Sequence, residues 1–137
     1  MREGEETIQY LSGWQALNIP NENGMIADWH PLLHLQKPLK FYSSKDSLLQ
    51  NRGISKRFVP MLNQSYYVAS FARAIADLLY NGKFVELQNC AYDFLNTEEE
   101  KELFSYLKLL RDRKGIENFM KYELTKLYFD EKKDKNA

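Results

Sequence analysis

Residues 66–81 read YYVASFARAIADLLYN, and this stretch decides the fold class that the sequence predicts. Its apolar side chains recur at intervals of three and four residues, which is the repeat of an amphipathic α-helix. They are Val68, Phe71, Ala72, Ile75, Leu78 and Leu79. The polar face is narrow, and a helix that is apolar over most of its circumference is usually buried. We therefore expect a central helix over residues 66–81, ended by Gly82.

The rest of the second half carries the same repeat, and we expect further helices over about 83–95, 97–114 and 116–130. Thr97 and Glu100 have the spacing of a capping box, in which two side chains satisfy the first main-chain N–H groups of a helix. Residues 131–137 are charged, and we expect this tail to fray.

The first half contrasts with this pattern, because all four prolines lie within it. We expect residues 1–64 to be irregular, with short helices and extended segments. The sequence thus predicts a mostly α fold in which about four helices in residues 65–130 form a compact bundle. A length of 137 residues fits a single domain spanning residues 1–137.

Charge and composition exclude several classes of protein. The chain has 19 basic and 19 acidic residues, and lacks the basic excess of a nonspecific nucleic-acid binder. Contact with DNA or RNA would have to come from a local patch. There is one cysteine, Cys90, which indicates a reducing compartment. The chain has no apolar run of membrane-spanning length and no signal-peptide core, so we expect a cytoplasmic protein without membrane contact.

One cluster has residue types that bind metals. Asp28, His30 and His34 could present a carboxylate and two imidazoles, which suit zinc or iron, and would imply a small metal-dependent hydrolase or nuclease. However, Pro31 separates the histidines and no HExxH motif is present. The alternative is structural: Asp28 caps a helix and the histidines are hydrogen-bonded or exposed. Cys90 is likewise read as a packed small side chain rather than a nucleophile. We predict no catalytic residue and no cofactor, and favour a protein that is not an enzyme.

Two groups of charged residues have open interpretations. Arg52, Lys56 and Arg57 surround Gly53, where a basic loop could bind phosphate, a nucleic acid or an acidic protein surface, or could simply be solvated. Arg73 and Asp77 are four residues apart on the expected central helix. They form either a weak surface pair or part of a buried polar network.

The last expected helix has apolar side chains on two sides. Tyr122 and Phe129 lie away from the stripe of Ile116, Met120 and Leu127. The extra face either packs on the first half of the chain or forms an exposed aromatic patch for a partner. We expect partner contact through Tyr122, Phe129 and Lys126, with Arg52 and Arg57 as a second patch.

Residues 14–20, WQALNIP, followed by residues 27–31, ADWHP, resemble the opening of short uncharacterised bacterial proteins, some of which lie beside toxin-like genes. The resemblance implies a protein partner and an antitoxin-like or defence-related role, and it assigns no residue. The leading hypothesis is a non-enzymatic protein-binding module that is an antitoxin-like neutraliser or a homo-oligomeric accessory protein.

Overall fold

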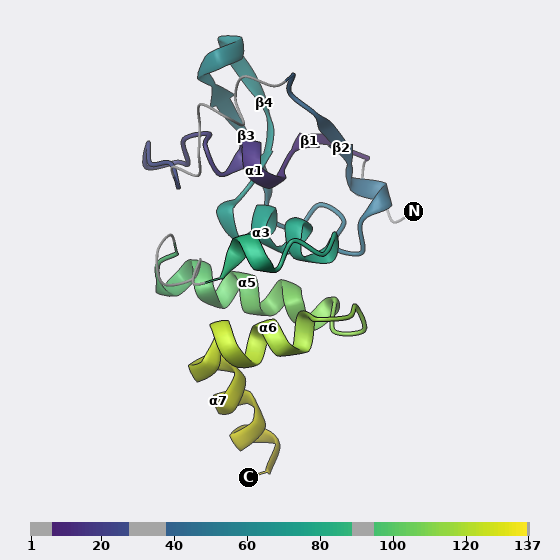
Figure 1. Ribbon diagram of the computed structural model, residues 1–137. Coiled ribbons are helices and arrows are strands. Elements are labelled where there is room, and N and C mark those ends of the chain that lie inside the picture. The colour runs from purple at the N-terminus through teal and green to yellow at the C-terminus, as the bar shows by residue number, and fades with distance from the viewer. Residues whose placement is uncertain (1–6, 28–37, 89–94, 137) are drawn as a thin grey trace. The chain divides into compact units, whose positions relative to one another are not determined.

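A β-sheet occupies the part of the chain that was expected to be irregular (Figure 1). The computed structural model describes residues 7–27, 38–88 and 95–136. The chain divides into two compact units, residues 1–74 and 75–137, and the boundary falls within helix α3 (Phe71–Tyr80). The prediction of a mostly α fold in a single domain is corrected on the first point, because the fold is mixed α/β.

The sheet of the first unit has four strands: β1 (Gln9–Leu11), β2 (Phe41–Ser43), β3 (Ile54–Val59) and β4 (Gln64–Ala69). Their order is β2-β1-β4-β3. β1 pairs with β2 in antiparallel and with β4 in parallel fashion, and β3 and β4 form an antiparallel hairpin. This unit also contains the short helices α1 (Gly13–Ala16), η1 (Ser44–Asp46) and η2 (Pro60–Leu62).

Side chains that lie opposite one another on paired strands point to the same face of a sheet, so the register defines two faces. One row across the four strands contains Tyr42, Tyr10, Tyr67 and Lys56. We call the face that carries this row the tyrosine face. The neighbouring row, on the opposite face, contains Phe41, Leu11, Val68 and Ser55.

The expected helix over residues 66–81 is wrong in its first turn, which is strand β4. Ser70 separates strand from helix: its N–H donates to the carbonyl of Gly53, and its hydroxyl accepts from the N–H of Arg73. The second contact is an N-cap, which satisfies a main-chain donor at the start of α3. Val68 matches the helical stripe only by coincidence of spacing, because a short apolar run fits a buried strand equally well.

The second unit is helical, as expected, with η3 (Val85–Leu87), α5 (Thr97–Leu109), α6 (Ile116–Glu123) and α7 (Thr125–Asn136). The single helix expected over residues 116–130 is two helices, because Leu124 leaves helical geometry at φ −121° and ψ 47°. The tail expected to fray belongs to α7 as far as Asn136. The helix expected over residues 83–95 is wrong where the structure describes it, because among residues 83–88 only the short 3-10 helix η3 is helical. Residues 89–94 lie outside the described residues.

A capping box does begin α5, one residue earlier than expected. The Asn96 side chain accepts from the N–H of Glu99 at 2.8 Å, and Glu99 accepts from the N–H of Asn96 at 2.9 Å. Asn is at least as good an N-cap as Thr, which explains why the helix starts there.

Apolar side chains are buried in both units. In the first unit the buried set includes residues of the strands, of α1 and of the segment after α1: Leu11, Ala16, Leu17, Ile19, Val59, Val68 and Ala69. In the second unit the buried set includes Leu79, Leu103, Leu107, Leu110, Ile116 and Met120.

Two glycines of the second unit provide a test of its packing. Gly82 and Gly115 both have left-handed backbones, with φ of 84° and 91°. A methyl group at Gly115 would lie 2.8 Å from the Phe84 ring, whereas at Gly82 it would meet nothing within 4 Å. We expect Gly82→Ala to lower the free energy of unfolding by about 1–2 kcal/mol through backbone strain alone. Gly115→Ala should cost more, because the Phe84 ring must also move.

The measurement is urea unfolding followed by circular dichroism at 222 nm. Equal losses in the two variants would show that Phe84 does not pack against Gly115 as described.

Candidate functional site

The three residues of the expected basic patch have different environments. Arg52 is exposed in the turn before β3, and its Nη1 donates to the carbonyl of Leu49 at 3.3 Å. Lys56 is exposed on the tyrosine face of β3. Arg57, the next residue, points to the opposite face and is buried. Alternation along the strand separates two cations that are adjacent in sequence.

Arg57 has a structural position, so the expectation that it lies on an exposed basic loop is wrong. Its Nη1 donates to the carbonyl of Pro20 and its Nη2 to that of Ala69, each at 2.9 Å. Burial lowers the pKa of Arg57, and the nearby carboxylate of Glu22 opposes this shift. The guanidinium thus joins the segment after α1 to the sheet.

Arg73 forms the buried polar network that was one of its two interpretations. It is fully buried, and its Nη1 donates to the carbonyls of Gln50, at 2.8 Å, and Arg52. Its Nη2 donates to the Tyr10 hydroxyl at 3.0 Å, and its guanidinium carbon lies 5.1 Å from the centroid of the Tyr10 ring. One side chain therefore connects α3, β1 and the turn before β3.

The expected contact surface of the second unit has exposed rings. Tyr122 on α6 is 64% exposed and Phe129 on α7 is 52% exposed, while Lys126 is exposed between them in sequence. Phe119, also on α6, is buried. The Tyr122 ring has the Lys121 ammonium 5.5 Å from its centroid, and Phe129 packs edge-on against Tyr128 at 5.5 Å.

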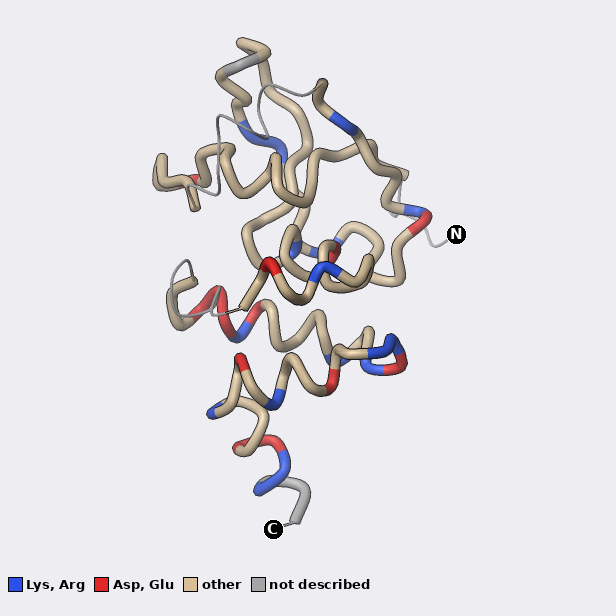
Figure 2. Tube along the Cα trace, viewed as in Figure 1, with Lys and Arg blue, Asp and Glu red and all other residues tan. Residues whose placement is uncertain are grey.

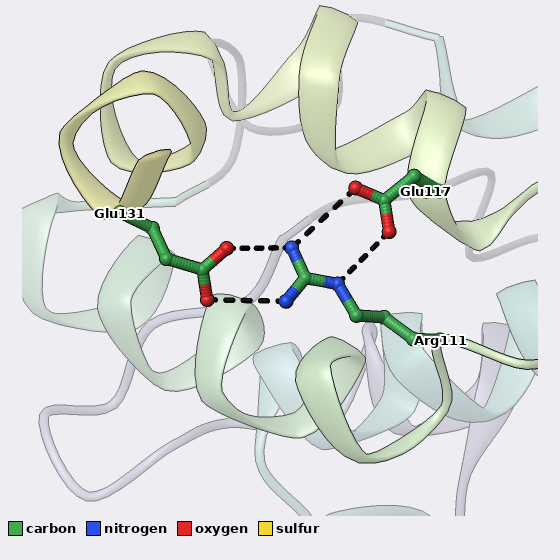
Figure 3. Close-up of polar contacts among 3 residues, drawn as sticks. All are labelled: Arg111, Glu117 and Glu131. Carbon is green, nitrogen blue, oxygen red and sulfur yellow. Dashed lines mark hydrogen bonds and ion pairs between the residues drawn. The ribbon is translucent and has the colours of Figure 1, made fainter. Parts of the chain in front are cut away.

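An ion cluster fixes the two helices that carry these rings (Figure 3). Arg111 follows α5, and its Nε lies 2.9 Å from Oε1 of Glu117 on α6. Its Nη2 lies 2.6 Å from Oε1 of Glu131 on α7, and its Nη1 donates to the other oxygen of Glu131 at 3.1 Å. A guanidinium that contacts one carboxylate through two nitrogens is held in a defined orientation. The sequence alone does not predict this cluster, because Arg111 and Glu131 are 20 residues apart and no local spacing connects them.

The cluster sets the ionisation of its members. Burial raises the pKa of Glu117, but the hydrogen bond from Tyr128 and the charge of Arg111 outweigh it, so this pKa lies below its ordinary value. The hydrogen bond to Glu131 raises the pKa of Arg111 further above its ordinary value. Glu117 is therefore a charged partner of Arg111 at neutral pH.

The proposed metal ligands Asp28, His30 and His34 lie outside the described residues, as does Cys90. Within residues 7–27, 38–88 and 95–136, no group of three or more His, Cys, Asp or Glu side chains could hold a metal ion. Among the helices of these same segments, none is long and apolar enough to cross a membrane.

No family model matches this sequence, and comparisons with curated proteins and with solved structures find no match.

Arg73 provides a stability test of the first unit. We expect Arg73→Met to lower the free energy of unfolding by about 3 kcal/mol, because two part-buried carbonyl groups and the buried Tyr10 hydroxyl lose this donor. Arg73→Lys should recover only part of this loss, since an ammonium cannot reproduce the guanidinium fork. Denaturant unfolding followed by tryptophan fluorescence measures both. A loss below about 1 kcal/mol in Arg73→Met would contradict the network.

Arg111 provides the equivalent test in the second unit. Arg111→Gln should cost about 1–3 kcal/mol, because charge-assisted hydrogen bonds to two carboxylates are lost. The matched control is Lys101→Gln, which breaks the exposed pair of Lys101 and Glu98 and should cost less than about 1 kcal/mol.

The contact between Arg111 and Glu117 also predicts that the stability of the fold depends on pH. A depressed pKa at Glu117 stabilises the folded state above the ordinary carboxylate pKa, and this contribution is lost as pH falls through the folded-state value. The wild-type chain should therefore lose stability more steeply on acidification than Arg111→Gln. Parallel stability profiles in the acid range would contradict this.

Proposed function

We propose that this protein is a non-enzymatic binding module that recognises another protein through the aromatic surface of its C-terminal helices. The observation that carries the proposal is the exposure of two large rings, Tyr122 and Phe129, on consecutive helices. Aromatic side chains dominate the energy of protein interfaces, whereas on a free surface they are hydrated at a cost.

The rigidity of α6 and α7 supports the same proposal. The Arg111 cluster holds a residue of each helix, Glu117 and Glu131, so the rings are attached to elements with fixed spacing. A preorganised surface loses less conformational entropy on binding than a flexible one. Lys126, exposed on the first turn of α7, would then supply a charge at the rim of the contact.

The resemblance of residues 14–20 and 27–31 to proteins beside toxin-like genes favours an antitoxin-like role for such a module. In this proposal the partner is a protein encoded nearby, and neutralisation is by occlusion rather than by chemistry. Self-association through the same rings is the homo-oligomeric form of the proposal.

Co-expression with neighbouring gene products, and sedimentation velocity of the isolated chain, test the proposal. We expect one stoichiometric complex or dimer that Tyr122→Ser or Phe129→Ser weakens by about 30-fold, which corresponds to the loss of about 2 kcal/mol at an interface hot spot. The control is Leu48→Ser, which removes a side chain of similar exposure, 63%, from the first unit.

Thermal unfolding of each variant separates lost binding from lost folding. A monomer at all concentrations with no partner would overturn the proposal, and so would a complex that both ring variants leave unchanged.

A further inference from the structure

The hairpin of β3 and β4 presents a second aromatic surface, of different character. Lys56 lies directly opposite Tyr67 in the register, and Phe58 lies opposite Ser65, two residues along. Phe58 and Tyr67 are therefore diagonal neighbours on the tyrosine face, within reach of one another. Phe58 is 52% exposed and Tyr67 is 41% exposed, so both rings are available to a ligand.

The same face continues across the sheet. Tyr10 and Tyr42 complete the row on β1 and β2, with ring centroids 6.1 Å apart, but Tyr10 is only 2% exposed because Arg73 covers it. Tyr42 is half-buried and has the Lys40 ammonium 5.1 Å from its centroid. Adjacent strands lie about 4.8 Å apart, so the row spans roughly 14 Å and has an exposed lysine near each end.

Charge on the first unit differs from that of the whole chain. Among its described residues, the exposed charged side chains are Lys40, Lys45, Arg52 and Lys56 against Glu22 and Asp46. Figure 2 shows the basic segments on β3 and directly before β2. Glu22 contacts Ser55 at 3.4 Å, and Ser55 points to the face opposite the row. The contact of Glu22 with β3 is therefore on the face opposite the tyrosine face.

Two exposed rings on neighbouring strands, Tyr67 and Phe58, with the exposed Lys56 on the same face, match the chemistry of a single nucleic-acid strand. Every base has a flat face that stacks on an aromatic side chain, and the phosphates pair with ammonium groups. Four-stranded sheets with ring side chains on an open face can stack two or three bases in this way. A duplex offers no such faces, because its bases are already stacked and paired.

We propose that the tyrosine face binds single-stranded nucleic acid, with bases stacked on Tyr67 and Phe58 and phosphates paired with Lys56 and Lys40. The site is the local patch that a chain of zero net charge would need. Of the expected basic cluster, this site includes Lys56 but not Arg57, which is buried. It also includes the rings of Tyr67 and Phe58, which the sequence analysis did not single out. It lies within the first unit and does not depend on the proposed protein-binding surface.

Fluorescence anisotropy of the full chain with a labelled 12-nucleotide oligo(U), an oligo(dT) and a duplex of the same length tests the site. We expect binding of a single strand and at least tenfold weaker binding of the duplex. Tyr67→Ala and Phe58→Ala should each weaken single-strand binding about tenfold or more. The matched control is Phe41→Ala, which removes a ring that is 37% exposed on the opposite face, and should leave binding unchanged.

Salt dependence tests the role of the lysines. Two phosphate contacts give a slope of about −1.4 in log K against log salt, and Lys56→Gln should reduce its magnitude by about 0.7. Tyr67→Leu, which keeps a bulky side chain on the strand, separates lost stacking from lost folding. The proposal is overturned by absence of single-strand binding at 50 mM salt, by equal binding of the duplex, or by equal losses in Phe41→Ala and Tyr67→Ala. A preference between oligo(U) and oligo(dT) would identify which sugar the site accepts.

Discussion

The architecture of the first unit depends on the buried guanidinium of Arg73. It donates to carbonyls of the turn before β3 and to the Tyr10 hydroxyl, so that helix, turn and strand share one anchor. The turn places Gln50 in a left-handed conformation, φ 52°, that is uncommon for a residue with a side chain. Arg73 also covers the Tyr10 ring, which is 2% exposed, whereas the Tyr67 ring beside it in the row is 41% exposed.

Two arginine side chains of this protein bind acceptors that are distant in sequence. Arg57 donates to the carbonyl of Pro20, which is 37 residues away, and Arg111 contacts Glu131, which is 20 residues away. A buried or part-buried cation requires acceptors, and the fold supplies them from distant segments. In β3 a buried structural cation, Arg57, follows an exposed one, Lys56, which remains available to a ligand.

The sequence predicted local features well and pairings poorly. Helical periodicity predicted α5 and the helical character of residues 116–130, since that signal lies within each helix, but it did not predict the break at Leu124 that divides α6 from α7. It did not separate strand from helix over residues 64–69, because a short apolar run fits both and the pairing with β3 decides between them. The rings of the candidate sites were partly predictable. Tyr122 and Phe129 lie outside the apolar stripe of their expected helix, whereas only the strand register shows that Tyr67 shares a face with Lys56 and Phe58.

The strand order also governs how the chain can fold during synthesis. β1 lies near the start of the chain, yet its parallel partner β4 follows after the intervening strands β2 and β3. Tyr10 and Tyr67, which pair, are 57 residues apart, so at 5–20 residues per second about 3–11 seconds separate their addition to the chain. During that interval the inner edge of β1 has no partner strand. The first unit therefore assembles only after its last strand is made, and the nascent segment before it depends on other contacts to avoid association with other chains.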